Sequence, residues 1–115
     1  MDTMASVTQR LFVYGTLGPD GPNRHILTKI GGYWLEASLR GDLKEAGWGS
    51  EQGYPAIELN PNAPPVNGYV FVSGNLKDHW DELDTFEGPE YERVVACVHL
   101  TDGTSIDAFA YTMRR

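Results

Sequence analysis

Alternation of apolar and polar residues is the clearest pattern in the chain and extends from residue 35 to residue 44. Its apolar positions are Leu35, Ala37, Leu39, Gly41 and Leu43, and the residues between them are Glu36, Ser38, Arg40, Asp42 and Lys44. A period of two is typical of a strand with one buried face and one wet face. Further segments rich in β-branched and aromatic residues are predicted to be strands, namely residues 11–14, 54–59, 68–72, 92–100 and 104–112.

An Asp-Gly pair at residues 102–103 lies between the last two of these segments. Asp-Gly between strand-like runs is a strong signal for a hairpin turn. A two-residue turn at this point sets Tyr111 opposite Val94. Because Tyr91 alternates with Arg93, the same register places Tyr91 and Tyr111 on opposite faces unless a bulge intervenes.

Residues 75–86 are the one good helix candidate, because Leu76, Trp80 and Leu83 fall on one face at helical spacing. The expected end signals are Ser73 or Asn75 as the N-cap and Gly88-Pro89 after the last turn. The acidic residues of this stretch are expected on its solvated face: Asp78, Asp81, Glu82 and Asp84.

A shorter helix is expected over residues 24–30, with Asn23 as its N-cap and Gly31-Gly32 as its stop. The pattern therefore predicts five or six strands and one proper helix. Strands that follow one another through turns indicate an α+β fold rather than a doubly wound sheet. So many short strands in 115 residues favour a closed or nearly closed barrel. This length is typical of one domain, so residues 1–115 are interpreted as a single domain.

The acidic balance of the chain excludes several classes of function. Nine basic and sixteen acidic residues give a formal net charge of −7. We therefore expect no nucleic-acid partner and no docking on an anionic membrane, since both need clustered Lys and Arg. No apolar stretch is long enough to span a membrane, and the start of the chain lacks a signal-peptide core, so a cytoplasmic location is expected.

Cys97 is the one cysteine, which excludes an internal disulfide and a Cys-rich zinc site. It lies in a strand-like run of valine and alanine, where we expect it to be a small buried residue. His25, His79 and His99 show no metal-ligand spacing.

Glu87 is the first candidate for chemistry. It lies one turn beyond Leu83 on the apolar stripe, so helical spacing points it toward the core. Desolvation and the negative end of the helix dipole both disfavour the charged carboxylate there. Both effects raise its pKa toward the range of a general base. The alternative is a frayed helix end with the side chain turned to water.

The second candidate is the loop after the first strand, residues 15–22, which holds three glycines and two prolines. Successive backbone N–H groups at Gly15 and Thr16 can form a small anion-binding nest. The glycine spacing fits neither a dinucleotide fingerprint nor a phosphate-binding P-loop. An ordinary Gly/Pro turn is the alternative interpretation.

Together these two features resemble the γ-glutamylcyclotransferase-like family. The resemblance rests on Tyr-Gly-Thr-Leu at residues 14–17, Tyr-Pro-Ala at residues 54–56 and Glu-Gly-Pro-Glu-Tyr-Glu-Arg at residues 87–93, and it covers nearly the whole chain. It implies a small mixed β-barrel with short flanking helices. It also implies that Glu87 is the catalytic glutamate and that Tyr91 and Tyr111 lie near the pocket. The implied substrate loop consists of Tyr14, Gly15, Thr16 and Leu17.

The resemblance further implies a small-molecule γ-glutamyl substrate, whose α-amine attacks its own γ-carbonyl and releases 5-oxoproline and a free amine. Ring closure is intramolecular, so positioning supplies much of the rate enhancement. Glu87 would accept the amine proton, and no metal or cofactor is required. Two alternatives stay open: a non-catalytic binding module on the same fold, and a small hydrolase that attacks with Thr16 or Cys97. The sequence does not indicate the leaving amine or the oligomeric state.

Overall fold

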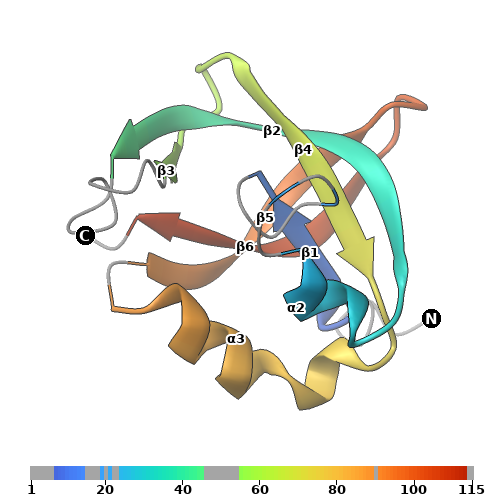
Figure 1. The fold of residues 1–115 in the computed structure, drawn as a ribbon. Coiled ribbons are helices and arrows are strands. Elements are labelled where there is room, and N and C mark those ends of the chain that lie inside the picture. The colour runs from blue at the N-terminus through green and yellow to red at the C-terminus, as the bar shows by residue number, and fades with distance from the viewer. Residues whose placement is uncertain are drawn as a thin grey trace.

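A computed structural model shows a barrel of short strands with helices packed along one side (Figure 1). It describes residues 7–14, 19, 21, 24–45, 55–89 and 91–113. The strands are β1 (Arg10–Val13), β2 (Tyr33–Glu45), β3 (Pro55–Leu59), β4 (Pro65–Val72), β5 (Tyr91–Leu100) and β6 (Ser105–Met113). The helices are α2 (His25–Thr28), the 3₁₀ turn η2 (Leu76–Asp78) and α3 (Trp80–Glu87). The prediction of an α+β fold built on a small mixed barrel is confirmed.

β1 closes the barrel because it pairs with strands from distant parts of the sequence, antiparallel with β4 and parallel with β6. β4 pairs with β2, and β2 with β3, both antiparallel. β3 returns to β6 through the parallel pair Ile57–Thr112. β5 pairs with β6 along its length and meets β2 at Ala37 and Ser38.

Side chains alternate across the barrel wall and form two apolar clusters. Phe12 of β1 and Tyr14, which follows β1, join the cluster inside the barrel, whereas Leu11 and Val13 join the outer cluster. The outer cluster also contains Leu27 of α2, Leu76 of η2 and Trp80 and Leu83 of α3, so the helices cover this face of the wall (Figure 1). The inner cluster fits around Phe12 because its neighbours include small residues, namely Ala96, Ala108 and Ala110.

The helical stretch before β5 is split into two pieces. His79 separates η2 from α3 because its φ of −123° and ψ of 4° lie outside the helical region. Ser73 is buried and its hydroxyl accepts a hydrogen bond from the N–H of Asn75. Asn75 holds the N-cap position of η2 without a side-chain capping hydrogen bond, so the position of the second suggested residue is confirmed and Ser73 supports the turn before it.

The predicted apolar face of this stretch is correct. Leu76, Trp80 and Leu83 are all buried in the outer cluster, and the indole N–H of Trp80 donates to the carbonyl of Thr8 at 3.1 Å. Gly88 ends α3 with a φ of 89°, a conformation that favours glycine. Within the described residues, no helix has the length and apolar character needed to cross a membrane.

α2 is shorter than the predicted helix over residues 24–30. Hydrogen bonds from Ile30 and Gly31 to the carbonyl of Leu27 continue the turn beyond its last residue. Gly31 has a φ of 89° and stops it as expected. The predicted N-cap, Asn23, lies outside the described residues.

The register predicted for the last hairpin is wrong by one residue. Leu100 and Thr104 are joined by a 2.8 Å hydrogen bond across the turn, and Gly103 has a φ of 92°. The turn therefore contains three residues with a glycine in the left-handed region, rather than two. As a result Tyr111 faces Arg93, and Tyr91 faces residue 113. Tyr91, Arg93 and Tyr111 thus share the outer face of the wall.

Two burial predictions also fail. Cys97 is exposed, because the alternation of β5 turns its neighbours Ala96 and Val98 into the barrel. Leu43 was expected on the buried face of its strand but is 53% exposed. β4 pairs with β2 only as far as Arg40, and the end of β2 that holds Leu43 pairs with β3 instead.

Gly68 is a test of the packing inside the barrel. A Cβ atom at this position would lie 2.2 Å from the carbonyl oxygen of Val13 and 2.9 Å from the ring of Phe12. We expect Gly68→Ala to destabilise the fold by about 1–3 kcal/mol in urea unfolding. Gly74→Ala is the matched control, because a Cβ there meets nothing within 4 Å. Equal stability of the two variants would contradict this account of the barrel interior.

Candidate active site

Glu87 is the last residue of α3 and its side chain is half-buried against the barrel. Burial raises the pKa of its carboxyl group to about 7. Among the described residues, no cation offsets this effect. Since the side chain is not turned fully to water, the alternative of a solvated, frayed end does not describe this structure. Glu87 has the environment of an acid or base that works near neutral pH.

Tyr14 follows β1 and its ring lies inside the barrel, stacked near Phe12. Its hydroxyl accepts a hydrogen bond from the N–H of Ile57 at 2.9 Å and donates one to the carbonyl of Tyr111 at 2.6 Å. The hydroxyl therefore bridges β3 and β6 beside the one register pair that joins these strands. Tyr14 has a clear structural role, whatever its role toward a ligand.

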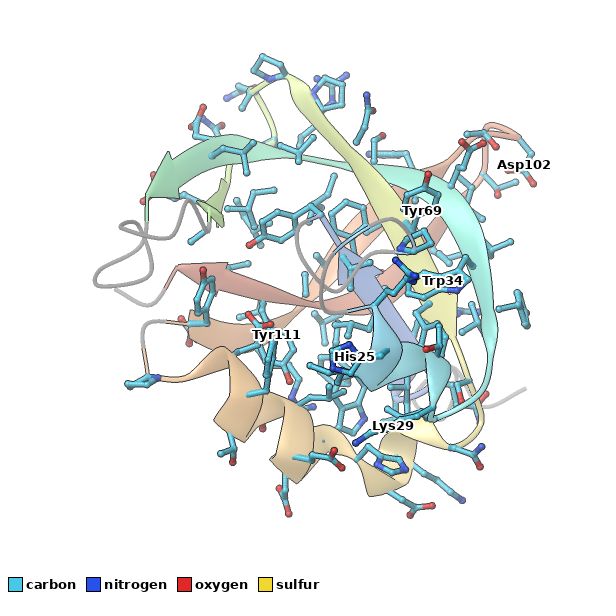
Figure 2. The ribbon with its side chains drawn as sticks, in the orientation of Figure 1. His25, Lys29, Trp34, Tyr69, Asp102 and Tyr111 are labelled. Atoms are coloured by element: carbon cyan, nitrogen blue, oxygen red, sulfur yellow. The ribbon has the colours of Figure 1, made fainter. Side chains whose placement is uncertain are left out.

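Tyr111 is the most buried of the predicted site residues that the structure describes. Its side chain is 5% exposed and lies on the side of the barrel that α3 covers (Figure 2). The hydroxyl donates a 2.6 Å hydrogen bond to Oδ1 of Asp84. Burial, followed by this bond and the charge of Asp84, raises the pKa of Tyr111 above its ordinary range.

Electrostatics place Glu87 close to both of these tyrosines. Burial is the main cause of the raised pKa of Tyr14, and the charges of Glu87 and Tyr91 raise it further. The charge of Glu87 also raises the pKa of Tyr111. Tyr91 begins β5 and packs against the outer cluster that contains Tyr111. The fold thus brings Glu87 and the three predicted tyrosines together at one end of the barrel wall.

The remaining predicted residues, Gly15, Thr16 and Leu17, lie outside the described residues. What the structure describes is the strand that leads to them, β1, which ends beside Glu87 and the tyrosines. The anion-binding role of their backbone N–H groups stays a prediction.

Asp84 is a residue of this site that the sequence reasoning missed. It was expected on the solvated face of the helix. Its carboxylate instead accepts a hydrogen bond from the Tyr111 hydroxyl and forms a bidentate ion pair with Arg93, at 2.9 Å to Nε and 3.2 Å to Nη2. Burial alone would raise the pKa of Asp84, but the bonds from Arg93 and Tyr111 hold it below its ordinary value. A signal was available, because Trp80, Leu83, Asp84 and Glu87 follow the i, i+3, i+4, i+7 pattern of one helix face.

The described residues contain no group of three or more His, Cys, Asp or Glu side chains that could hold a metal ion. His79 instead pairs with Glu82 at 3.1 Å, and Lys29 pairs with the other oxygen of Glu82 at 3.2 Å. The ring of His99 contacts the hydroxyl of Ser105 at 3.0 Å.

A concave region lies elsewhere on the barrel, away from Glu87. It is a groove of about 340 Å³ between β2, β4 and the end of β5, and its polar lining includes Glu36, Ser38, Asn67, Tyr69 and His99. Of the predicted site residues that the structure describes, namely Tyr14, Glu87, Tyr91 and Tyr111, none lines it. Glu36 and His99 are exposed, so the groove lacks the desolvated acid or base that makes Glu87 the stronger candidate.

Comparisons with known proteins agree with the fold. The sequence model of the family "Gamma-glutamyl cyclotransferase, AIG2-like" matches residues 11–115. A comparison with curated proteins gives no match.

Solved structures similar to this chain include proteins from animals, plants, bacteria and archaea. An AIG2-like protein from Mus musculus has 25% identity and a TM-score of 0.71, over 91% of this chain and 76% of the mouse chain. YkqA from Bacillus subtilis has 27% identity and a TM-score of 0.68, over 92% of this chain but only 36% of YkqA. A γ-glutamyl cyclotransferase with 21% identity and a TM-score of 0.68 shares the fold over 92% of this chain and 66% of its own.

The bridging role of Tyr14 can be measured. Tyr14→Phe removes the hydroxyl and leaves the N–H of Ile57 and the carbonyl of Tyr111 without this partner. We expect a loss of about 1–3 kcal/mol in the free energy of unfolding. Tyr33→Phe is the control, because Tyr33 is 59% exposed. A Tyr14→Phe variant as stable as the control would show that the bridge does not support the barrel.

The environment of Glu87 predicts a pH-dependent stability. Its pKa is about 7 in the folded protein and near 4.5 in an ordinary setting, so the folded state binds the proton more tightly. Tighter proton binding at Glu87 therefore contributes its full stabilisation to the folded state below about pH 4.5, and this stabilisation is lost as the pH rises through about 7. We expect Glu87→Gln to be more stable than the parent at pH 8, on the order of 2 kcal/mol, and to show little difference at pH 4.

The control for this experiment is Glu82→Gln on the same helix. Hydrogen bonds from His79 and Lys29 lower the pKa of Glu82, the opposite direction to the shift at Glu87. Glu82→Gln should therefore gain no stability at pH 8. Urea unfolding at both pH values gives the comparison. A Glu87→Gln variant that is less stable than the parent at pH 8 would contradict the burial of this carboxylate.

Proposed function

This chain belongs to the γ-glutamyl cyclotransferase, AIG2-like family, and from that premise we propose that it converts γ-glutamyl compounds into 5-oxoproline and a free amine, with Glu87 as the general base. The observation that carries this proposal is a half-buried carboxylate with a pKa of about 7 beside three tyrosines. The proposed substrates are γ-glutamyl amines, peptides and related amides.

The reaction forms a bond between the α-nitrogen and the γ-carbonyl carbon, and it breaks the amide bond from that carbonyl carbon to the leaving nitrogen. Overall, two protons move from the α-ammonium nitrogen to the leaving nitrogen. A carboxylate with a pKa of about 7 can accept these protons in turn and donate them again near neutral pH. An ordinary glutamate, which stays ionised at pH 7, would return a proton far less readily.

The hydrogen bonds of the tyrosines support recognition of an amine at this place. The hydroxyl proton of Tyr14 is donated to the carbonyl of Tyr111, and that of Tyr111 is donated to Asp84. Neither hydroxyl has a second proton to donate, so a ligand would meet acceptor oxygens here. Together with the carboxylate of Glu87, these oxygens complement the donor N–H groups of a primary amine. The α-carboxylate of the substrate then needs separate donors, a role we assign to the backbone N–H groups of Gly15, Thr16 and Leu17.

Positioning supplies much of the catalysis in this proposal. Amine and carbonyl belong to one molecule, so the site need only fold the γ-glutamyl chain into its ring-closing shape. Tyr91 and Tyr111 would form the walls that hold this shape.

The experiment is a panel of γ-glutamyl compounds assayed for 5-oxoproline. We expect Glu87→Gln to lower kcat by at least about 100-fold, while the fold and ligand binding are retained. Since the ionised form of Glu87 is the base, kcat/KM of the parent protein should rise with pH through a value near 7. Glu82→Gln, on the same helix and exposed, should keep full activity.

Full activity of Glu87→Gln would rule out this mechanism. If no panel member is turned over although one of them binds and raises Tm, the chain is a non-catalytic binding module on the same fold.

A further inference from the structure

An ion pair between Asp84 and Arg93 lies one helical turn from Glu87 and does not include it. Asp84 and Glu87 are separated by one turn of α3, a spacing at which side chains are neighbours on a helix surface. Arg93 reaches this helix from β5, yet its guanidinium binds Asp84 and not Glu87. Of these two carboxylates on one helix face, Asp84 is paired with a cation, whereas Glu87 is affected by burial alone.

Arg93 is held in place from several sides. Its guanidinium lies 4.6 Å from the ring centroid of Trp80 on α3 and 4.6 Å from that of Phe109 on β6. Asp84 contacts it with both carboxylate oxygens, and the fork of an arginine matches this geometry. The same carboxylate accepts the hydroxyl proton of Tyr111. One side chain, Asp84, therefore fixes both a cation and a tyrosine next to Glu87.

We propose that Asp84 is a positioning residue of the site, whose carboxylate holds Tyr111 in orientation and keeps the guanidinium of Arg93 away from the carboxylate of Glu87. This inference rests on the proposed function, but its physical core concerns only the charges around Glu87. Without Asp84, a neighbouring arginine would pair with Glu87 and convert it into an ordinary ionised glutamate with little capacity as a proton carrier.

The proposal predicts opposite changes in the pKa of Glu87 when Asp84 and Arg93 are substituted. In Asp84→Asn, a negative neighbour is lost and Arg93 is released, and both changes lower the pKa of Glu87. In Arg93→Gln, Asp84 loses its cation and its negative charge raises the pKa of Glu87. The other described titratable groups whose pKa responds to the charge of Glu87 are Tyr14 and Tyr111; both residues are kept in the two variants, and Asp84→Asn also weakens the hydrogen bond that orients the Tyr111 hydroxyl.

The direct measurement is an NMR titration of the Glu87 carboxyl carbon in the parent protein and in each variant. We expect a fall of about one pH unit in Asp84→Asn and a rise of similar size in Arg93→Gln. The control is Asp81→Asn, an exposed acid one turn earlier on the same helix, which should leave the titration unchanged. The experiment needs no turnover, so it stands even if the proposed activity fails.

Activity gives a second readout once the panel has identified a substrate. The rising limb of kcat/KM should move to lower pH in Asp84→Asn and to higher pH in Arg93→Gln, parallel to the titrations. Limiting kcat in Asp84→Asn should fall roughly tenfold, as is typical of a disturbed acid–base group.

An unchanged Glu87 titration in both variants, or a shift in the same direction in both, would overturn the proposal. If one variant does not fold, the other still tests the proposal, because a fall of the Glu87 pKa is expected in Asp84→Asn and a rise in Arg93→Gln. A merely structural role for the Asp84–Arg93 pair would lower Tm without moving the two titrations apart.

Discussion

The parallel pairing of β1 with β6 is the contact on which the arrangement of this molecule depends. Leu11 lies opposite Phe109 and Phe12 opposite Ala110, although about a hundred residues separate the two strands. This closure places Tyr14 inside the barrel, where its hydroxyl reaches the carbonyl of Tyr111 and the N–H of Ile57. Residues from the two ends of the chain thereby form one wall, against which α3 packs.

The same wall determines the electrostatics of the site. Asp84 and Glu87 are one turn apart, but Asp84 is paired with Arg93 and bonded by Tyr111, whereas burial without a compensating cation dominates at Glu87. Two carboxyl groups with diverging pKa values at one location are a common feature of acid–base sites. Within the part of the chain that the structure describes, the divergence arises because the guanidinium of Arg93 pairs with Asp84 alone, between the rings of Trp80 and Phe109.

Stability and function make opposing demands on the end of α3. A cation beside the last turn of α3 would interact favourably with the helix dipole and would also stabilise the ionised form of the half-buried Glu87. The chain instead ends the helix with an acid that favours the neutral form, followed by Gly88 in a conformation that favours glycine. Local rules broken without an evident structural gain are expected at functional sites rather than in the scaffold.

The sequence by itself determined the class of fold, the strands, the apolar face of α3 and the inward direction of Glu87, because each follows from a local period of two or 3.6 residues. It did not determine the register of the last hairpin, which depends on whether the turn holds two or three residues. It also missed Asp84 and the exposure of Cys97. The partners of Asp84 come from β5 and β6, and the face that Cys97 occupies depends on which side of β5 the barrel encloses. Only the tertiary structure decided these points, because they depend on contacts between segments that no local pattern relates.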